Sequence, residues 1–119
     1  MEWYNKYKDD NVNHKCFINN FNDLNDELFI KYLEELFEIY NYSKNIKKKI
    51  KLTLNIECNS FPRIFFFRKY LKYFQIFNNL LEKYVLELKI EVNNFFSRIL
   101  LRFILFLIKP KINYNVITI

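Results

Sequence analysis

Apolar and polar residues alternate along two short stretches of the chain, and this alternation predicts two strands. Within residues 49–57 the alternating apolar positions are Ile50, Leu52, Leu54 and Ile56, and within residues 85–92 they are Leu86, Leu88, Ile90 and Val92. A period of two is typical of a strand with one buried face. The same spacing at Ile112, Tyr114 and Val116 predicts a third, final strand.

Three longer stretches repeat their apolar residues with the period of a helix. They span about Asp23–Tyr40, Ser60–Tyr84 and Asn94–Lys109. Ser60 is the expected N-cap of the second helix, whose first turn tolerates Pro62 because that position needs no N–H donor. Pro110 follows the third helix and is expected to end it.

The third helix is nearly all apolar, and Arg98 and Arg102 are the only charged residues within 95–108. A membrane-spanning helix needs about 20 apolar residues. We therefore expect a buried core helix, with a peripheral membrane contact as the alternative. Two arginines on such a helix must reach a phosphate, a carboxylate or solvent, because burying them unpaired is unfavourable.

Together these elements predict an α+β fold in the order α-β-α-β-α-β, with a small sheet of two to three strands packed against two or three helices. Residues 1–22 are polar and predict an irregular N-terminal arm, followed by a single domain at 23–119. The chain has no Gly, so Asn, which tolerates the left-handed region, is expected to mark element boundaries. The candidates are Asn41, Asn59, Asn93 and Asn94.

Charge is distributed unevenly along the chain. Residues 1–42 hold four Lys against nine acids, whereas residues 43–119 hold fifteen Lys or Arg against four Glu. This split predicts one part that faces a polyanion and another that faces a protein. A solvated Lys-rich surface is the alternative, because the abundance of Phe, Ile, Lys, Asn and Tyr indicates a very AT-rich genome.

The chain lacks the residues that catalysis usually requires. His14 lies in the predicted arm with no inferable partner, and the absence of Gly excludes a phosphate loop or a nucleophile elbow. Cys16 and Cys58 have no metal-ligand spacing and predict free thiols. Glu34 and Glu38 fit a solvated helix face. We therefore predict a protein that is not an enzyme, without a metal, a cofactor or a small-molecule substrate.

Three groups of basic residues are the candidate RNA-binding site. They are Lys44, Lys47, Lys48, Lys49 and Lys51; Arg63, Arg68, Lys69 and Lys72; and Arg98, Arg102, Lys109 and Lys111. Lys and Arg contacts to phosphates provide sequence-independent affinity that falls with salt. Tyr and Phe among them could stack on unpaired bases.

Two segments resemble a ribosomal family. YNYSKNIKKKIKLTLNIE (residues 40–57) is similar to the first strand, with its basic lead-in, of the large-subunit ribosomal protein that binds 5S rRNA. KIEVNNFFSRILLRFILFLIKPKI (residues 89–112) resembles the second signature of that family. The resemblance implies a structural protein that binds rRNA.

These observations predict a structural, rRNA-binding component of an organellar ribosome, in mitochondria and encoded there, or otherwise in the cytoplasm. The acidic arm and first helix are expected to meet neighbouring proteins. MEWYNKYKDD lacks the apolar segment of a signal peptide. The alternative is a non-enzymatic accessory subunit of a mitochondrial membrane complex, docked through the third helix.

Overall fold

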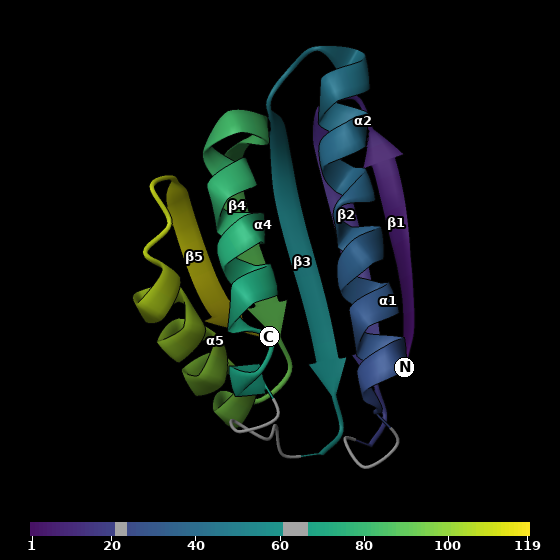
Figure 1. Cartoon of the computed structure of the whole chain (residues 1–119), viewed down its shortest axis with the longest axis vertical. Helices are drawn as coiled ribbons and strands as arrows, with labels where there is room; N and C mark the ends of the chain where they lie inside the picture. The colour runs from purple at the N-terminus through teal and green to yellow at the C-terminus, as the bar shows by residue number, and fades with distance from the viewer. Residues whose placement is uncertain (21–23, 61–66) are drawn as a thin grey trace.

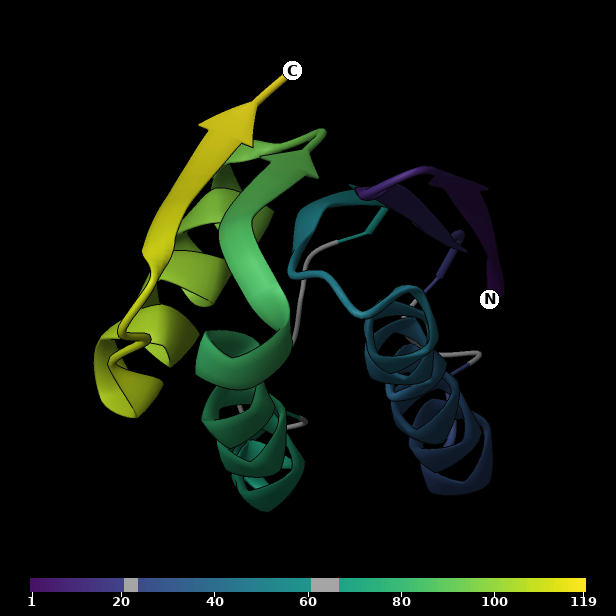
Figure 2. The same ribbon diagram turned by 90° about the horizontal axis from the view of Figure 1, so that it is seen from above.

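One five-stranded sheet organises the chain, and every helix of the described residues packs on the same face of it (Figures 1 and 2). The computed structural model describes residues 1–20, 24–60 and 67–119. Its strands are β1 (Glu2–Lys8), β2 (Asn11–Ile18), β3 (Ile50–Cys58), β4 (Val85–Val92) and β5 (Asn113–Thr118). Its helices are α1 (Asp26–Leu36), α2 (Glu38–Ile46), α4 (Leu71–Tyr84) and α5 (Phe95–Ile108).

The strands lie side by side in the order in which the chain makes them. β1 and β2 form an antiparallel hairpin, and β2, β3, β4 and β5 are parallel neighbours. Each parallel connection needs a crossover, which the helices supply. All the crossover helices that the structure describes cover one face, and none of them lies over the other face of the sheet (Figure 2).

The predicted α+β class is confirmed, but the prediction of two to three strands and an irregular N-terminal arm is wrong. The sheet has five strands, and β1 and β2 lie within the supposed arm. The buried positions of β2 are Val12, His14, Cys16 and Ile18. A polar His and a Cys among the inward positions weakened the alternation that marks a strand. The remaining order from α1 to β5 agrees with the prediction.

The third predicted helix, α5, has nearly the predicted bounds, and the first two differ from theirs. The first helix is a pair, α1 and α2, joined at Phe37 and extending to Ile46. The prediction of one helix over Ser60–Tyr84 is wrong, because a turn at Lys69 and Tyr70 precedes α4, which begins at Leu71. Pro62 and Arg63 lie in residues 61–66, outside the described residues. Leu86, predicted to face inward in β4, is 52% exposed, next to a register irregularity at Ile50 and Lys51 of β3.

Charged residues, and not Asn, occupy the left-handed backbone positions of the described residues. Asp9, Lys47 and Lys109 have φ values of 54°, 57° and 50°. Asn instead begins helices: the Asn25 side chain accepts from the Leu28 N–H and begins α1. Asn94 does the same for α5. Both satisfy a backbone donor that a helix start leaves unpaired.

The core lies between the sheet and the helices, and α5 only partly belongs to it. Leu100, Ile104 and Leu105 are buried, which confirms one side of the predicted core helix. The prediction that α5 is buried overall is wrong, since several of its aromatic rings are exposed. Among the described residues, no helix combines the length and the apolar character that crossing a membrane requires.

His14 is a core residue that ties the hairpin to α1, which corrects its placement in a loose arm. It is 2% exposed. Its Nδ1 lies 2.6 Å from Asn5 Oδ1, and its Nε2 lies 2.8 Å from the Tyr32 hydroxyl. Burial lowers the pKa of His14 to about 4. His14 is therefore neutral and structural at physiological pH.

This burial predicts that the fold weakens in mild acid. The unfolded chain takes up a proton at His14 near pH 6.5, whereas the folded chain does so only near pH 4. The stabilisation is fully present above pH 6.5 and is lost as the pH falls toward 4, by roughly 3 kcal/mol in total.

Chemical denaturation of the wild type and of His14→Gln at several pH values between about 6.5 and 5 tests this prediction. We expect the free energy of unfolding to fall with pH in the wild type and to be nearly flat in the variant. Equal slopes in the two proteins would contradict a buried, neutral His14.

Candidate nucleic-acid interface

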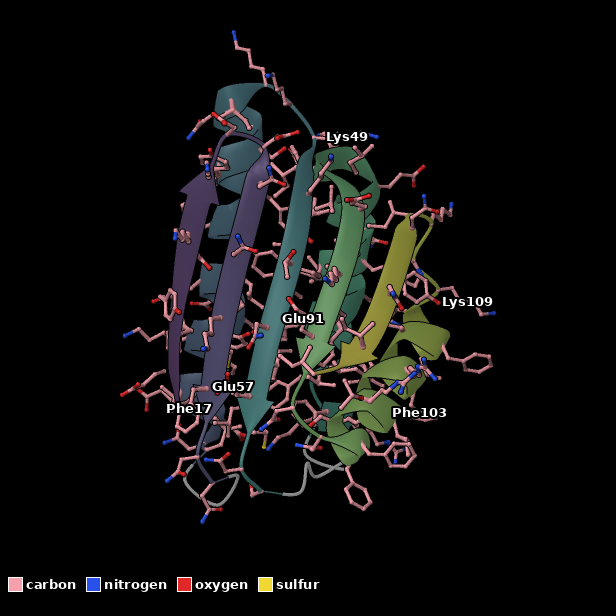
Figure 3. All side chains as sticks on the ribbon, turned by 180° about the vertical axis from the view of Figure 1, so that it is seen from behind. Phe17, Lys49, Glu57, Glu91, Phe103 and Lys109 are labelled. Carbon is pink, nitrogen blue, oxygen red and sulfur yellow. The ribbon has the colours of Figure 1, made fainter. Side chains whose placement is uncertain are left out.

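The first predicted basic group forms one exposed turn at an end of the molecule. Lys44 lies in the last turn of α2, Lys47 ends that helix, and Lys48 and Lys49 lead into β3, where Lys51 follows. All five are exposed. The turn projects beyond the other elements (Figure 1), and Lys49 marks this end in Figure 3. A projecting turn can approach a phosphate backbone without a steric clash.

Ser43 holds this turn in place. It is 3% exposed, and its Oγ lies 2.5 Å from the Lys48 carbonyl oxygen and 3.1 Å from that of Tyr84, at the end of α4. The Lys48 N–H also donates to the Ser43 carbonyl oxygen. Because one buried hydroxyl joins α2, the turn and α4, the backbone that carries these lysines is held in one conformation.

A second contact fixes the turn against the hairpin. The Tyr42 hydroxyl of α2 donates to the Asp9 carbonyl oxygen at 2.6 Å, and the Tyr42 and Tyr7 rings lie 4.3 Å apart. The Lys51 N–H donates to the Asp10 carbonyl oxygen at 2.8 Å. The ends of β1, β2, α2 and β3 therefore meet at one place.

The strand register brings further lysines to this end on the helix-free face. Lys8 lies opposite Asn11, which lies opposite Lys51. Two residues further along the strands, Lys6, Asn13, Thr53 and Lys89 are paired in a row across the same face. We call the combined surface the lysine patch: Lys6, Lys8, Lys44, Lys47, Lys48, Lys49, Lys51 and Lys89. The acids at this end include Asp9, Asp10, Glu82 and Glu87.

The patch borders a shallow polar depression in the helix-free face. The depression is lined by residues of all four parallel strands, among them Asn11, Thr53 and Asn115, and Lys51, Lys89 and the acidic Glu87 also line it. Amides and hydroxyls can donate to and accept from sugar and base groups. The surface thus combines phosphate-binding charge with neutral hydrogen-bonding groups.

The other half of the same face is acidic. Glu57 and Glu91 lie toward the ends of β3 and β4, far from Lys49 (Figure 3). Glu57 forms an ion pair with Lys15 at 3.3 Å. The helix-free face therefore gathers most of its lysines at one end and carries Glu57 and Glu91 toward the other, which favours binding of a polyanion at the lysine end.

The second predicted basic group lies at the opposite end of the sheet, where β3 ends and α4 begins. Arg68, Lys69 and Lys72 are exposed. The Lys69 ammonium lies 2.5 Å from Asp26 Oδ1 of α1. This ion pair lowers the pKa of Asp26. Arg63 falls outside the described residues. This group therefore includes one lysine that pairs within the chain.

The third predicted group is on and after α5, apart from both others. Arg102 is exposed, and Arg98 is half-buried with its Nε lacking a hydrogen-bond partner among the described residues. Lys109 and Lys111 follow the helix, and Figure 3 places Lys109 at the outer side of the molecule. The twelve predicted residues that the structure describes thus do not form one surface. Lys6, Lys8 and Lys89, which no local run indicated, join the first group through strand register alone.

The described part of the chain shows no arrangement suited to metal chemistry. No group of three or more His, Cys, Asp or Glu residues converges there. Cys16 and Cys58 are buried, unpaired thiols. Burial raises the pKa of Cys16 to about 11, so it is protonated and unreactive near neutral pH.

Compared with family models, curated proteins and solved structures, the chain gives no match. The resemblance of residues 40–57 and 89–112 to the 5S rRNA-binding family accordingly stays a prediction.

Ser43→Ala tests whether the buried hydroxyl orders the lysine turn. The variant leaves the Lys48 and Tyr84 carbonyl oxygens without that donor, and we expect it to lower the free energy of unfolding by about 1–3 kcal/mol. Hydrogen exchange at Lys47 and Lys48 should accelerate. Asn45→Ala, an exposed change on the same helix, is the control and should change both quantities little. Unchanged exchange in Ser43→Ala would show that the turn is ordered by other contacts.

Proposed function

We propose that the chain is a structural, non-enzymatic RNA-binding protein that lies on an RNA backbone with its lysine patch. The observation that carries the proposal is the patch itself, with eight lysines from β1, α2, β3, β4 and the turn between α2 and β3 gathered at one end of the molecule. Each lysine that meets a phosphate releases condensed counterions, and this release favours binding. The neutral groups of the polar depression can then contact sugars and unpaired bases.

The RNA is, in this proposal, rRNA of an organellar ribosome, in mitochondria. Two features of the sequence support this choice: the resemblance of residues 40–57 to a 5S rRNA-binding protein, and a composition typical of an AT-rich, organelle-encoded gene. The lysine turn lies within the first of those segments. The proposal does not use Arg68, Lys69 and Lys72, which lie at the other end of the sheet.

A neighbouring protein is proposed to meet the helical layer. Glu27 and Glu34 of α1 and Glu38 of α2 are exposed there, away from the helix-free face. An acidic surface repels RNA and suits a basic protein partner. The two faces of the fold would therefore serve different partners.

Equilibrium binding to rRNA fragments at several salt concentrations tests the function. The wild type should bind with an affinity that falls steeply with salt. The triple variant Lys47→Gln/Lys48→Gln/Lys49→Gln should bind more weakly, with a slope of log K against log salt that is smaller by about two to three. The reason is that up to three phosphate contacts are removed.

The matched control is Lys31→Gln/Arg68→Gln/Lys72→Gln, which removes the same charge from exposed positions away from the patch. It should retain the wild-type slope. Equal losses of RNA affinity in the two triple variants would indicate that net charge alone attracts the RNA. A wild-type protein that does not bind RNA would contradict the proposal.

A second candidate function is favoured by the exposed face of α5. Phe95, Ile99 and Phe106 are 61%, 46% and 70% exposed on the side away from the sheet. Residues 93–119 contain no acid. Such a face suits an accessory subunit that docks through α5. The partner protein would offer an apolar surface for the rings and acidic groups that pair with Arg98 and Arg102. Binding of this kind would persist at high salt, which distinguishes it from RNA binding.

A further inference from the structure

β5 is an edge strand without the features that usually protect an edge. Its residues, Asn113–Thr118, include no charge and no Pro, and they pair with β4 in an unbroken register. The other edge strand, β1, carries Glu2, Lys6 and Lys8. Charged side chains on an edge oppose pairing with another strand, and an uncharged, regular edge permits it.

The backbone of β5 presents its free hydrogen-bonding groups at alternate residues. The Ile119 N–H donates to the Val92 carbonyl oxygen of β4 at 2.9 Å. Alternate residues of a strand point their N–H and C=O groups to opposite sides. The odd-numbered residues of β5 therefore face β4, and Tyr114, Val116 and Thr118 direct theirs to the open edge.

The helix above this edge continues the uncharged surface. Leu101, Leu105 and Ile108 of α5 pack against the main core. One flank of the helix, next to the buried Leu100 and Ile104, carries Phe96, Phe103 and Leu107, which are 53%, 49% and 44% exposed. We call these three residues the outer line.

The outer line faces away from the centre of the molecule. Figure 3 shows Phe103 on the side of α5 away from β1–β3, and Figure 2 shows α5 beside the edge that β5 forms. Arg98 and Arg102 project from another side of the helix, because each residue turns the direction by about 100°. The outer line and the edge of β5 are thus both uncharged.

We propose that a second copy of this chain occupies this surface, with β5 pairing antiparallel to β5 of its partner about a two-fold axis at Val116. In this register Val116 lies opposite itself and Tyr114 lies opposite Thr118, so every outward N–H and C=O of the three residues is paired. A register one residue away, centred on Asn115, leaves Thr118 without a partner in the strand.

The helical layers support the same arrangement. A two-fold axis perpendicular to the sheet places the helices of both copies on one face, so the two α5 helices run antiparallel beside each other. Phe103 lies near the middle of α5, and its ring meets the outer line of the other copy. An isologous contact brings each residue close to its own copy, and the outer line and the β5 edge place no charged side chain of their own in that contact.

Sedimentation across a wide concentration range tests the proposal on the whole chain. We expect a reversible dimer of twice 14.9 kDa. Phe103→Asp replaces a half-exposed ring of each copy by a charge and should weaken the dimer by on the order of 100-fold. Thr118→Pro removes an outward N–H that the monomer does not use, and should weaken it as well.

Tyr4→Asp is the matched control, an exposed aromatic residue (60%) on the other edge strand. It should leave the dimer unchanged. Circular dichroism of each variant separates loss of the dimer from loss of the fold. The proposal would be overturned by a protein that is monomeric at all concentrations. It would also be overturned by a dimer that neither Phe103→Asp nor Thr118→Pro weakens.

Cross-linking tests the register. The proposed axis places Asn115 opposite Ile117 of the other copy, at a separation that a disulfide can bridge. The double variant Asn115→Cys/Ile117→Cys should therefore form a covalent dimer on mild oxidation, whereas Asn115→Cys alone should not. Efficient cross-linking of the single variant would place the axis at Asn115 and overturn the proposed register.

Discussion

The structure depends on the burial of one face of a five-stranded sheet under helices that all come from the same side. The inward residues of β2, β3 and β4, such as Val12, Leu52 and Ile90, are nearly inaccessible to solvent. This burial is the main favourable contribution to the fold, and it fixes the register of each strand, since a slip of one residue would expose the apolar set. The fixed register in turn aligns lysines from β1, β3 and β4 on the helix-free face. The proposed RNA surface is therefore a consequence of the core.

The absence of Gly adds a second constraint. A left-handed residue with a Cβ costs about 1–2 kcal/mol, and the described residues place three of them at Asp9, Lys47 and Lys109. Lys47 shows how the cost is offset. Its N–H bonds to the Lys44 carbonyl oxygen, and Ser43 holds the neighbouring Lys48 carbonyl oxygen from below. The lysine turn thus rests on the same buried hydroxyl that joins α2 to α4. Structure and proposed function share this contact.

Local sequence patterns predicted β3, β4 and α5, because each of these elements has a clear period and a recognisable boundary. Their order along the chain then predicted the α+β class. The hairpin of β1 and β2 could not be read in the same way. Its inward positions include His14, a polar residue whose partners are Asn5 in the neighbouring strand and Tyr32 in α1. Such partners are set by long-range packing. For the same reason, the run Lys44–Lys51 was visible as a basic group, whereas Lys6 and Lys89 join it only after strands distant in sequence pair. The exposure of Phe103 on α5 could not be predicted from the sequence, because a nearly all-apolar helix is expected to be buried on every side.

The most direct test of the central claim, that RNA lies on the lysine patch, is the acetylation of individual lysines with and without bound rRNA, measured by mass spectrometry. The account predicts protection of Lys47, Lys48 and Lys49 in the turn, and of Lys6 and Lys89 on the helix-free face. Lys31, Lys69 and Lys72 should react as they do in the free protein. Protection centred on Lys69 and Lys72, or spread evenly over all lysines, would contradict it.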